Sequence, residues 1–233
     1  MNIMNFPTPE NEQERVELLR KLDILDSLAE SSYDFIVGVA SRLFDSPVAF
    51  ISFLDENRQW FKATVGLEVK ETPREVAFCN YTILNENILV VEDMQQDDRF
   101  KNNPFVKDDP SFRFYAGFPI TLGDDLRIGT VCVLDNKPRT FSENDKMLLK
   151  ELAEHVTDLI KIRKISDELR EKNREVQELQ KLIPICSWCG KIKDDQNYWQ
   201  SVESYISQQQ HSKITHSICD DCSKNLTEDM ELM

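Results

Sequence analysis

The sequence holds 233 residues, of which 40% are hydrophobic and 30% are charged, and its formal net charge is −14. These values are typical of a globular protein with extensive exposed helical surface. Binding to a phosphate backbone or to an anionic membrane needs clustered Lys and Arg, so the acidic balance argues against nucleic-acid and membrane partners. The N-terminal segment lacks the features of a secretory signal, and no apolar run approaches the ~18 residues of a membrane span. We therefore expect a cytoplasmic protein.

Two amphipathic helices are expected at the start of the chain. A capping residue, a proline and an acid follow one another at Thr8-Pro9-Glu10, which is typical of a helix start. Apolar residues at spacings of three and four follow as far as Leu25, and the same spacing recurs across residues 32–43. Both patterns predict helices that pack on a hydrophobic core.

Short strands are expected next. Apolar, β-rich runs on either side of polar turns predict two hairpins, formed by residues 47–54 with 59–65 and 113–122 with 127–134. Residues 88–91 predict a further strand. Five or six short strands bracketed by helices indicate an α+β fold with a central antiparallel sheet.

One long helix is expected from Ser142 to about Ile183. Residues 142–145 (SEND) form a capping box with Asp in place of the usual Glu, and neither Gly nor Pro occurs before Pro184. The first part of this helix is expected to pack on its own domain. Beyond Lys161, apolar residues at spacings of three and four stand among charged ones, which is typical of a coiled-coil seam. We therefore expect a homodimer.

The middle of the chain resembles bacterial GAF domains. The resemblance covers about residues 10–160 and rests on segments that occur in the same order: NEQERVELLRKLDILDS, VAFISFLDENRQWFKATVGL, TPREVAFCNYTI, VVEDMQQDDRF, RFYAGFPI and IGTVCVLDNKPR. It implies a sheet of about six strands with helices on one face, and a small-molecule pocket between the other face and a lid segment. GAF domains are usually non-catalytic sensors or dimerisation modules, so the resemblance implies a protein that is not an enzyme.

The resemblance also implies where a ligand would bind. Candidate pocket residues on the lid and the facing strands are Cys79, Tyr81, Asp93, Asp97, Arg99, Arg113 and Tyr115. Arg99 and Arg113 could hold a ligand carboxylate or phosphate. Alternatively, they pair with Asp97 or Asp98 and close a pocket that holds nothing. Cys132, in the apolar run TVCVL, is expected to be a core residue.

Two Cys-x-x-Cys pairs lie near the C-terminus, Cys186 with Cys189 and Cys219 with Cys222. Four thiolates satisfy the tetrahedral coordination of zinc and leave no open position, so the spacing predicts a structural zinc site. His216, three residues before Cys219, is a candidate substitute ligand or a hydrogen-bond partner of a ligand. The surrounding stretch resembles a small module appended to bacterial sensor and response-regulator proteins.

These features predict four parts: a GAF sensor domain (1–160), a coiled-coil linker helix (161–183), a zinc-binding module (184–226) and a tail (227–233). The expected function is signal transduction, in which the GAF domain binds a small molecule or dimerises and signals through the coiled coil to a partner protein. The rival hypothesis is a thiol-based redox switch or thiol enzyme that uses the Cys-x-x-Cys pairs or Cys79.

Overall fold

A computed structural model describes residues 6–123, 125–180, 184–193, 196, 198–210 and 217–218. The chain divides into two compact units, Met1–Asp167 and Glu168–Met233. The elements of the first unit, in chain order, are α1 (Glu12–Lys21), α2 (Ser31–Leu43), β1 (Val48–Leu54), β2 (Arg58–Val65), β3 (Glu71–Pro73), the 3-10 turn η1 (Arg74–Val76), α3 (Cys79–Thr82), β4 (Leu89–Val91), α4 (Pro104–Lys107), β5 (Phe114–Leu122) and β6 (Leu126–Asp135). Helix α5 (Glu143–Gln180) begins in this unit and ends in the second.

The six strands form one antiparallel sheet in the order β3-β2-β1-β6-β5-β4. The expected hairpins β1–β2 and β5–β6 are both present, and β1 pairs with β6 to join them at the centre of the sheet. Strand β3 was not expected, because it contains three residues and ends in a proline. The α+β architecture that the sequence predicts is therefore confirmed.

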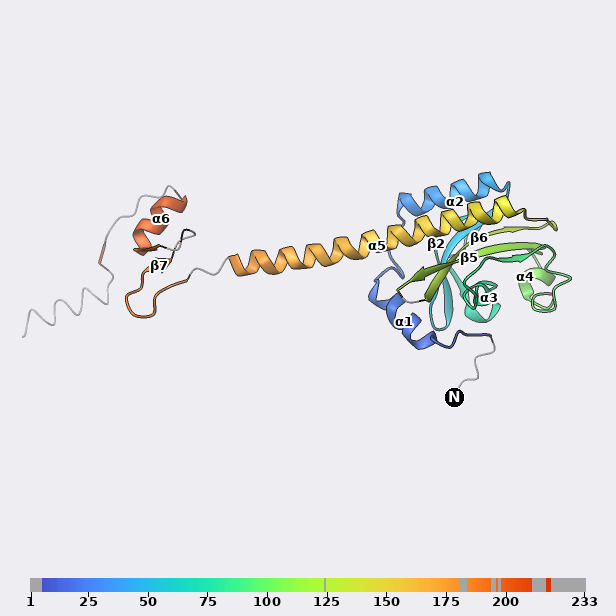
Figure 1. Cartoon of the computed structure of the whole chain (residues 1–233), viewed down its shortest axis with the longest axis horizontal. Coiled ribbons are helices and arrows are strands. Elements are labelled where there is room, and N and C mark those ends of the chain that lie inside the picture. The colour runs from blue at the N-terminus through green and yellow to red at the C-terminus, as the bar shows by residue number, and fades with distance from the viewer. Residues whose placement is uncertain are drawn as a thin grey trace, which may run out of the picture. The chain divides into compact units, whose positions relative to one another are not determined.

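Helices α1, α2 and the first part of α5 cover one face of the sheet. Figure 1 shows α2 and α5 side by side over this face. The apolar side chains of these helices pack against alternate residues of the strands, such as Ala49, Ile51 and Phe53 of β1. The α5 residues in this core recur at spacings of three and four: Leu149, Ala153, Val156 and Ile160.

Shorter elements, η1, α3 and α4, cover the opposite face, where the resemblance places a lid (Figure 1). The aromatic ring of Phe78 lies at the centre of this layer. Its centroid is 5.6 Å from that of Phe100, 6.4 Å from that of Phe105 and 5.8 Å from that of Tyr115. Tilted and edge-on contacts of this kind stabilise aromatic clusters.

A buried ionic network ties α1 to the lid. The guanidinium groups of Arg15 and Arg74 are fully buried, and both donate to the carboxylate of Glu12. Each arginine also donates to a main-chain carbonyl, Arg15 to Leu54 at 2.5 Å and Arg74 to Asp55 at 2.8 Å. Because one carboxylate serves two buried cations, Glu12 holds the start of the lid against the N-terminal helix.

Helix α5 begins with the expected capping box. The main-chain N–H of Asp145 donates to Ser142 Oγ at 3.1 Å, and the N–H of Ser142 donates to the Asp145 carboxylate at 3.0 Å. Further along, the apolar side chains of the predicted seam are half or more exposed: Ile162, Ile165, Leu169, Val176 and Leu179. None of the described helices is long and apolar enough to cross a membrane.

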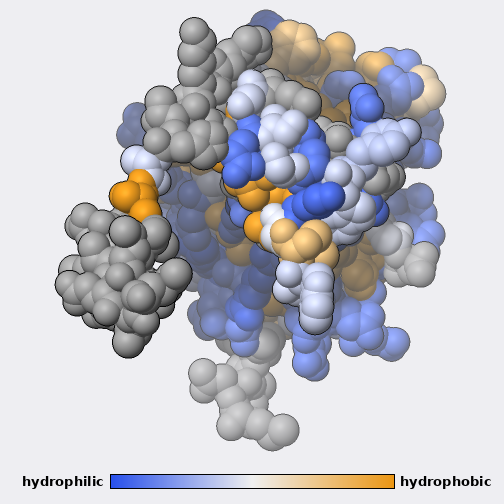
Figure 2. All heavy atoms as spheres, turned by 90° about the vertical axis from the view of Figure 1, so that its left-hand side faces the viewer, coloured by the Kyte–Doolittle hydropathy of each residue, from blue (hydrophilic) through white to orange (hydrophobic). Residues whose placement is uncertain are grey.

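The second unit contains β7 (Ile192–Lys193), β8 (Trp199–Gln200) and α6 (Val202–Gln210). Strands β7 and β8 pair antiparallel, and α6 follows β8 in the chain. Figure 2 shows hydrophobic side chains, in orange, exposed among hydrophilic ones on the described part of the chain.

Candidate ligand-binding site

A cavity of about 220 Å³ lies on the lid side of the sheet. Its floor comes from β1, β2 and β6, and its walls come from residues 66–69, 76–78 and 105–112. The lining is mostly apolar and rich in aromatic rings: Phe50, Phe61, Leu67, Val69, Val76, Ala77, Phe78, Phe105, Pro110, Phe112 and Leu134. A small cavity of this composition suits a compact apolar or aromatic molecule.

Three polar side chains interrupt the apolar lining, Gln59, Glu68 and Thr72, and of these Glu68 is exposed to solvent. The Nε2 of Gln59 donates to Ser52 Oγ at 2.8 Å and to Cys79 Sγ at 3.1 Å. The Oγ1 of Thr72 is buried and has no hydrogen-bond partner among the described residues. A buried hydroxyl without a partner costs free energy, and a ligand with one polar group could recover it.

The charged residues that the resemblance placed at the pocket lie elsewhere. Arg113 makes a bidentate contact with Asp93 at 2.8 and 2.6 Å, and Arg99 makes one with Asp97 at 2.9 and 2.6 Å. Hydrogen bonds from these arginines hold the pKa of each aspartate below its usual range. The side chains pair with one another rather than line the cavity. The alternative expectation named Asp97 as a partner, which is the partner of Arg99, whereas Arg113 pairs with Asp93.

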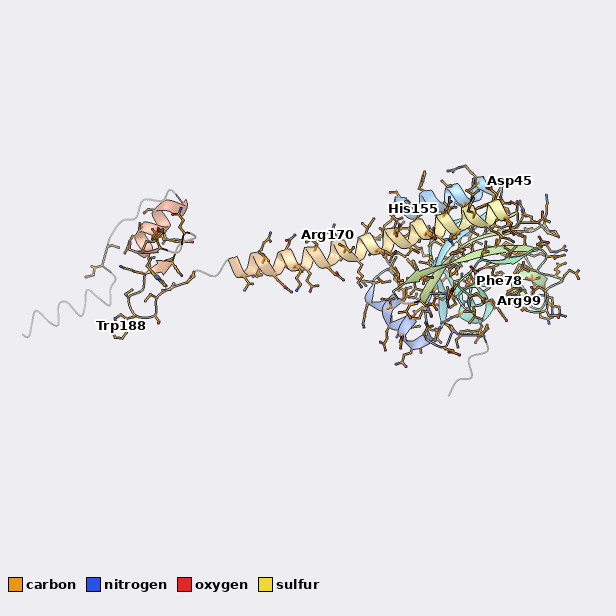
Figure 3. The ribbon with its side chains drawn as sticks, viewed as in Figure 1. Asp45, Phe78, Arg99, His155, Arg170 and Trp188 are labelled. Atoms are coloured by element: carbon orange, nitrogen blue, oxygen red, sulfur yellow. The ribbon has the colours of Figure 1, made fainter. Side chains whose placement is uncertain are left out.

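Tyr81 belongs to the same outer layer. Its ring packs edge-on against Phe100 at 4.9 Å, and the Arg99 guanidinium lies 5.9 Å from its centroid. Figure 3 shows Arg99 and the cavity residue Phe78 on the same, α3 side of the sheet. Arg99 is therefore held by a carboxylate and by aromatic rings.

Cys79 and Tyr115 lie together, fully buried, beneath the lid. The Tyr115 hydroxyl is 3.5 Å from Cys79 Sγ and 3.2 Å from Cys132 Sγ, and the two sulfurs are 3.6 Å apart. Thr130 Oγ1 donates to Cys79 Sγ at 3.1 Å. We call Ser52, Gln59, Cys79, Tyr115, Thr130 and Cys132 the thiol cluster. Cys132 is a core residue, as expected, but it contacts polar atoms.

The two thiols differ in their acidity. Burial raises the pKa of Cys79, but hydrogen bonds from Cys132, Thr130, Tyr115 and Ser52 outweigh it and lower that pKa to about 7. Burial and the neighbouring Cys79 raise the pKa of Cys132 well above its usual value. Of the two thiols, Cys79 is therefore the one that deprotonates more readily.

Sequence reasoning missed most of the residues that line the cavity. The available signal was the two-residue period of the strands, which puts Phe50, Gln59, Phe61 and Leu134 on the face opposite the helices. Ser52, Gln59 and Thr130 are polar residues on that face, whose other strand residues are mostly apolar. The loop residues 66–69 carried no such period.

The first Cys-x-x-Cys pair forms a tight turn. The N–H of Gly190 donates to the carbonyl of Cys186 at 2.9 Å, and the N–H of Cys186 donates to the carbonyl of Lys191 at 2.8 Å. Gly190 has a φ of 66°, a conformation that favours glycine. Main-chain N–H groups of Cys189 and Trp188 hydrogen-bond the Cys186 sulfur and lower its pKa. In Figure 3, Trp188 projects away from this turn.

The other zinc candidates lie outside the described residues: Cys219, Cys222 and His216. Within the described part of the chain, no group of three or more potential metal ligands comes together. Cys186 and Cys189 suit two of the four ligand positions of a zinc site. Their thiols are separated by two residues on a turn whose N–H groups stabilise a thiolate.

A family model described as the GAF domain matches residues 27–159. The chain belongs to the GAF domain family. GAF domains form a sensory and regulatory family, and the family match confirms the resemblance. The expected sheet with its flanking helices is present in the structure. The match ends within α5, near the predicted domain boundary at residue 160.

A solved GAF domain shares the fold. This domain, from a phosphoenolpyruvate-protein phosphotransferase of Coxiella burnetii, is 14% identical, with a TM-score of 0.50, and the match covers 67% of this chain and 98% of that one. Another, from an Acinetobacter phosphoenolpyruvate-protein phosphotransferase, is 21% identical, with a TM-score of 0.49, and the match covers 66% and 98%.

A curated relative corrects one expectation. This chain is 39% identical over 148 residues to a protein of Pseudomonas aeruginosa named as a cyclic di-GMP phosphodiesterase. The match covers 63% of this chain and 25% of the relative, so the chain spans about a quarter of that protein's length. Because a relative this similar is named as an enzyme, the expectation that the chain is not an enzyme is wrong. That expectation rested on the usual role of GAF domains as sensors, which does not test for activity.

Proposed function

We propose that this GAF protein senses a small, mainly apolar ligand in the cavity beside Gln59 and Thr72. The observation that carries the proposal is the buried Thr72 hydroxyl, which has no hydrogen-bond partner among the described residues and lies in a mostly apolar lining. A ligand that combines an aromatic or aliphatic body with one hydrogen-bonding group satisfies both parts of this lining. The cavity volume of about 220 Å³ limits that ligand to roughly the size of one or two fused rings.

The cavity walls suggest how a bound ligand could change the conformation of the protein. Residues 66–69 and 105–112 belong to loops and a short helix, whereas the floor belongs to the central strands. A ligand that contacts both the wall and the floor stabilises conformations in which these wall segments lie against the sheet. The signal depends on the difference between its affinities for the two lid positions.

Calorimetric titration with indole, a fused-ring probe with one N–H donor, tests the proposal. Ala77→Leu adds three carbon atoms to the cavity lining and is expected to weaken indole binding at least tenfold. Ala29→Leu is the matched control, since Ala29 is exposed and does not line the cavity. Equal indole affinities for the wild type and both variants, or no binding to any of them, would contradict the proposal.

We also propose that α5 mediates dimerisation, so that the GAF domain signals through a coiled coil to a partner protein. In support, the seam residues from Ile162 to Leu179 are exposed in the single chain and recur at spacings of three and four. The lysine at position 172 falls in this seam and pairs with Glu175 at 2.9 Å. A polar residue in a seam lowers stability but fixes the register of the two helices.

For the C-terminal unit we propose a structural zinc site formed by Cys186, Cys189, Cys219 and Cys222, with His216 as an alternative ligand or partner. The turn at Cys186–Gly190 supports this proposal, because it presents two thiols together. Bound zinc would cross-link two short segments of a small module that has little core of its own.

Cyclic di-GMP phosphodiesterase activity is a second candidate function, favoured by the relative with that name. Incubation of the purified chain with cyclic di-GMP and Mg²⁺ or Mn²⁺, with chromatography of the nucleotides, tests it. Enzyme-dependent release of a linear dinucleotide would establish the activity. Unchanged cyclic di-GMP with both metals would remove this candidate and leave the ligand-sensing proposal untouched.

A further inference from the structure

Two cysteines that are far apart in the sequence meet beneath the lid. Cys79 begins α3 and Cys132 lies in β6, yet their sulfurs are 3.6 Å apart. A disulfide bond is about 2.0 Å long, so the sulfurs need to approach by roughly 1.6 Å. Side-chain rotation with a small shift of the short helix α3 covers such a distance.

The surroundings of the pair are unusual for a hydrophobic core. Donors from Gln59, Thr130 and Tyr115 lie within 3.5 Å of the Cys79 sulfur. Thiols in cores pack as small apolar groups and need no such donors. Converging donors favour a thiolate, which is the form of cysteine that reacts with oxidants.

The strand next to Cys132 leaves space for these contacts. Gly117 of β5 is paired with Cys132, and a Cβ at Gly117 would collide with the Tyr115 hydroxyl and lie 3.0 Å from Cys132 Sγ. The glycine therefore allows the Tyr115 hydroxyl to reach both sulfurs. A side chain of any size at position 117 would displace it.

The cavity gives a route by which a small oxidant can approach. Gln59 lines the cavity and also contacts Cys79 Sγ at 3.1 Å. Phe78, the residue before Cys79, lines the same cavity. Rotation of the Gln59 side chain would open the thiol cluster to a molecule of the size of hydrogen peroxide.

We propose that Cys79 and Cys132 are a modification site at which a hydroperoxide converts the two thiols into a disulfide. The Cys79 thiolate attacks the hydroperoxide, so that an S–O bond forms and the O–O bond breaks. The leaving oxygen takes up a proton and departs as an alcohol, or as water when the oxidant is hydrogen peroxide. Cys79 is thereby oxidised by two electrons to a sulfenic acid.

Cys132 completes the reaction. Its sulfur loses a proton and attacks the Cys79 sulfur, so that the S–S bond forms and the S–O bond breaks, and the hydroxyl leaves as water. Thr130 accepts from the Cys132 thiol at 3.1 Å and donates to Cys79 at 3.1 Å. This hydroxyl is thus placed to pass the proton of Cys132 toward the leaving oxygen. The sum is two thiols and one hydroperoxide to one disulfide, one alcohol and one water.

Treatment of the reduced full-length protein with stoichiometric hydrogen peroxide tests the proposal. The sample is then unfolded in N-ethylmaleimide, digested and mapped by mass spectrometry, which separates Cys79 and Cys132 from the C-terminal cysteines. The expected product is a cross-linked pair of peptides containing Cys79 and Cys132, formed at least tenfold faster than in the same chain oxidised while unfolded.

Two variants distinguish the roles of the sulfurs. Cys132→Ala is expected to retain a Cys79 sulfenic acid that dimedone traps, whereas Cys79→Ala is expected to leave Cys132 as a free thiol after the same treatment. Far-ultraviolet circular dichroism checks that both variants fold. Recovery of Cys79 and Cys132 as alkylated thiols from the folded wild type, or faster cross-linking in the unfolded chain, would overturn the proposal.

Discussion

The Nε2 of Gln59 lies 3.1 Å from the Sγ of Cys79, and the same Gln59 side chain lines the cavity. Gln59 therefore belongs to both the cavity lining and the thiol cluster. A ligand that draws the Gln59 amide into the cavity removes a donor from Cys79. Occupancy of the cavity and acidity of the thiol are thereby expected to influence one another.

Gln59→Leu is expected to raise the pKa of Cys79 above its value of about 7, since the variant lacks one of the donors to the sulfur. Titration of the thiolate ultraviolet absorbance measures this pKa, with Cys79→Ser subtracted to remove the other thiols. An unchanged midpoint in Gln59→Leu would show that the amide does not stabilise the thiolate.

Thr72→Val is expected to increase the free energy of unfolding of the empty protein by about 1 kcal/mol, because it removes a buried hydroxyl that lacks a partner. The same change is expected to weaken indole binding, because the indole N–H loses its acceptor. Thr64→Val is the matched control. Thr64 Oγ1 donates to the Leu67 carbonyl at 3.0 Å, so its loss is expected to destabilise the protein. Urea unfolding compares the two, and destabilisation by Thr72→Val would contradict the assignment.

Glu12→Gln is expected to lower the free energy of unfolding by about 3 kcal/mol, since it leaves the buried guanidinium groups of Arg15 and Arg74 without their carboxylate. Glu14→Gln, an exposed change in the same helix, is the control. Equal losses in the free energy of unfolding of the two variants would show that Glu12 stabilises the fold no more than an exposed glutamate does.

The contribution of Glu12 also depends on pH. Burial raises its pKa, but hydrogen bonds from Arg15 and Arg74 outweigh this, and the pKa lies below its usual value of 4.5. A lowered carboxyl pKa stabilises the folded state above the usual value, and this contribution is lost as pH falls through the folded pKa. The difference in stability between wild type and Glu12→Gln is therefore expected to shrink below about pH 4.5. A difference that grows on acidification would contradict the sign.

Leu169→Glu is expected to weaken a dimer at least tenfold, because it places a charge in the proposed seam of α5. Arg170→Glu introduces the same side chain one position away, off the seam, and is expected to have little effect. Sedimentation equilibrium measures both. A monomeric wild type would contradict the proposed dimer.

Much of the fold was predictable because local patterns agreed with one another. The capping box at Ser142 and Asp145 and the period of the strands each depend on residues close in sequence. The cavity was harder to predict, because its walls depend on where loops 66–69 and 105–112 return to the sheet. The approach of Cys79 to Cys132 depends on where α3 packs against β5 and β6, which local patterns do not determine.

The amide NMR spectrum of the full-length protein during titration with indole tests the central claim most directly, because it locates binding residue by residue. The account predicts saturable shifts at residues 66–69, 72–78 and 105–112, and the loss of these shifts in Ala77→Leu. An unchanged spectrum, or shifts confined to residues outside the cavity lining, would contradict the claim that this GAF domain binds a ligand there.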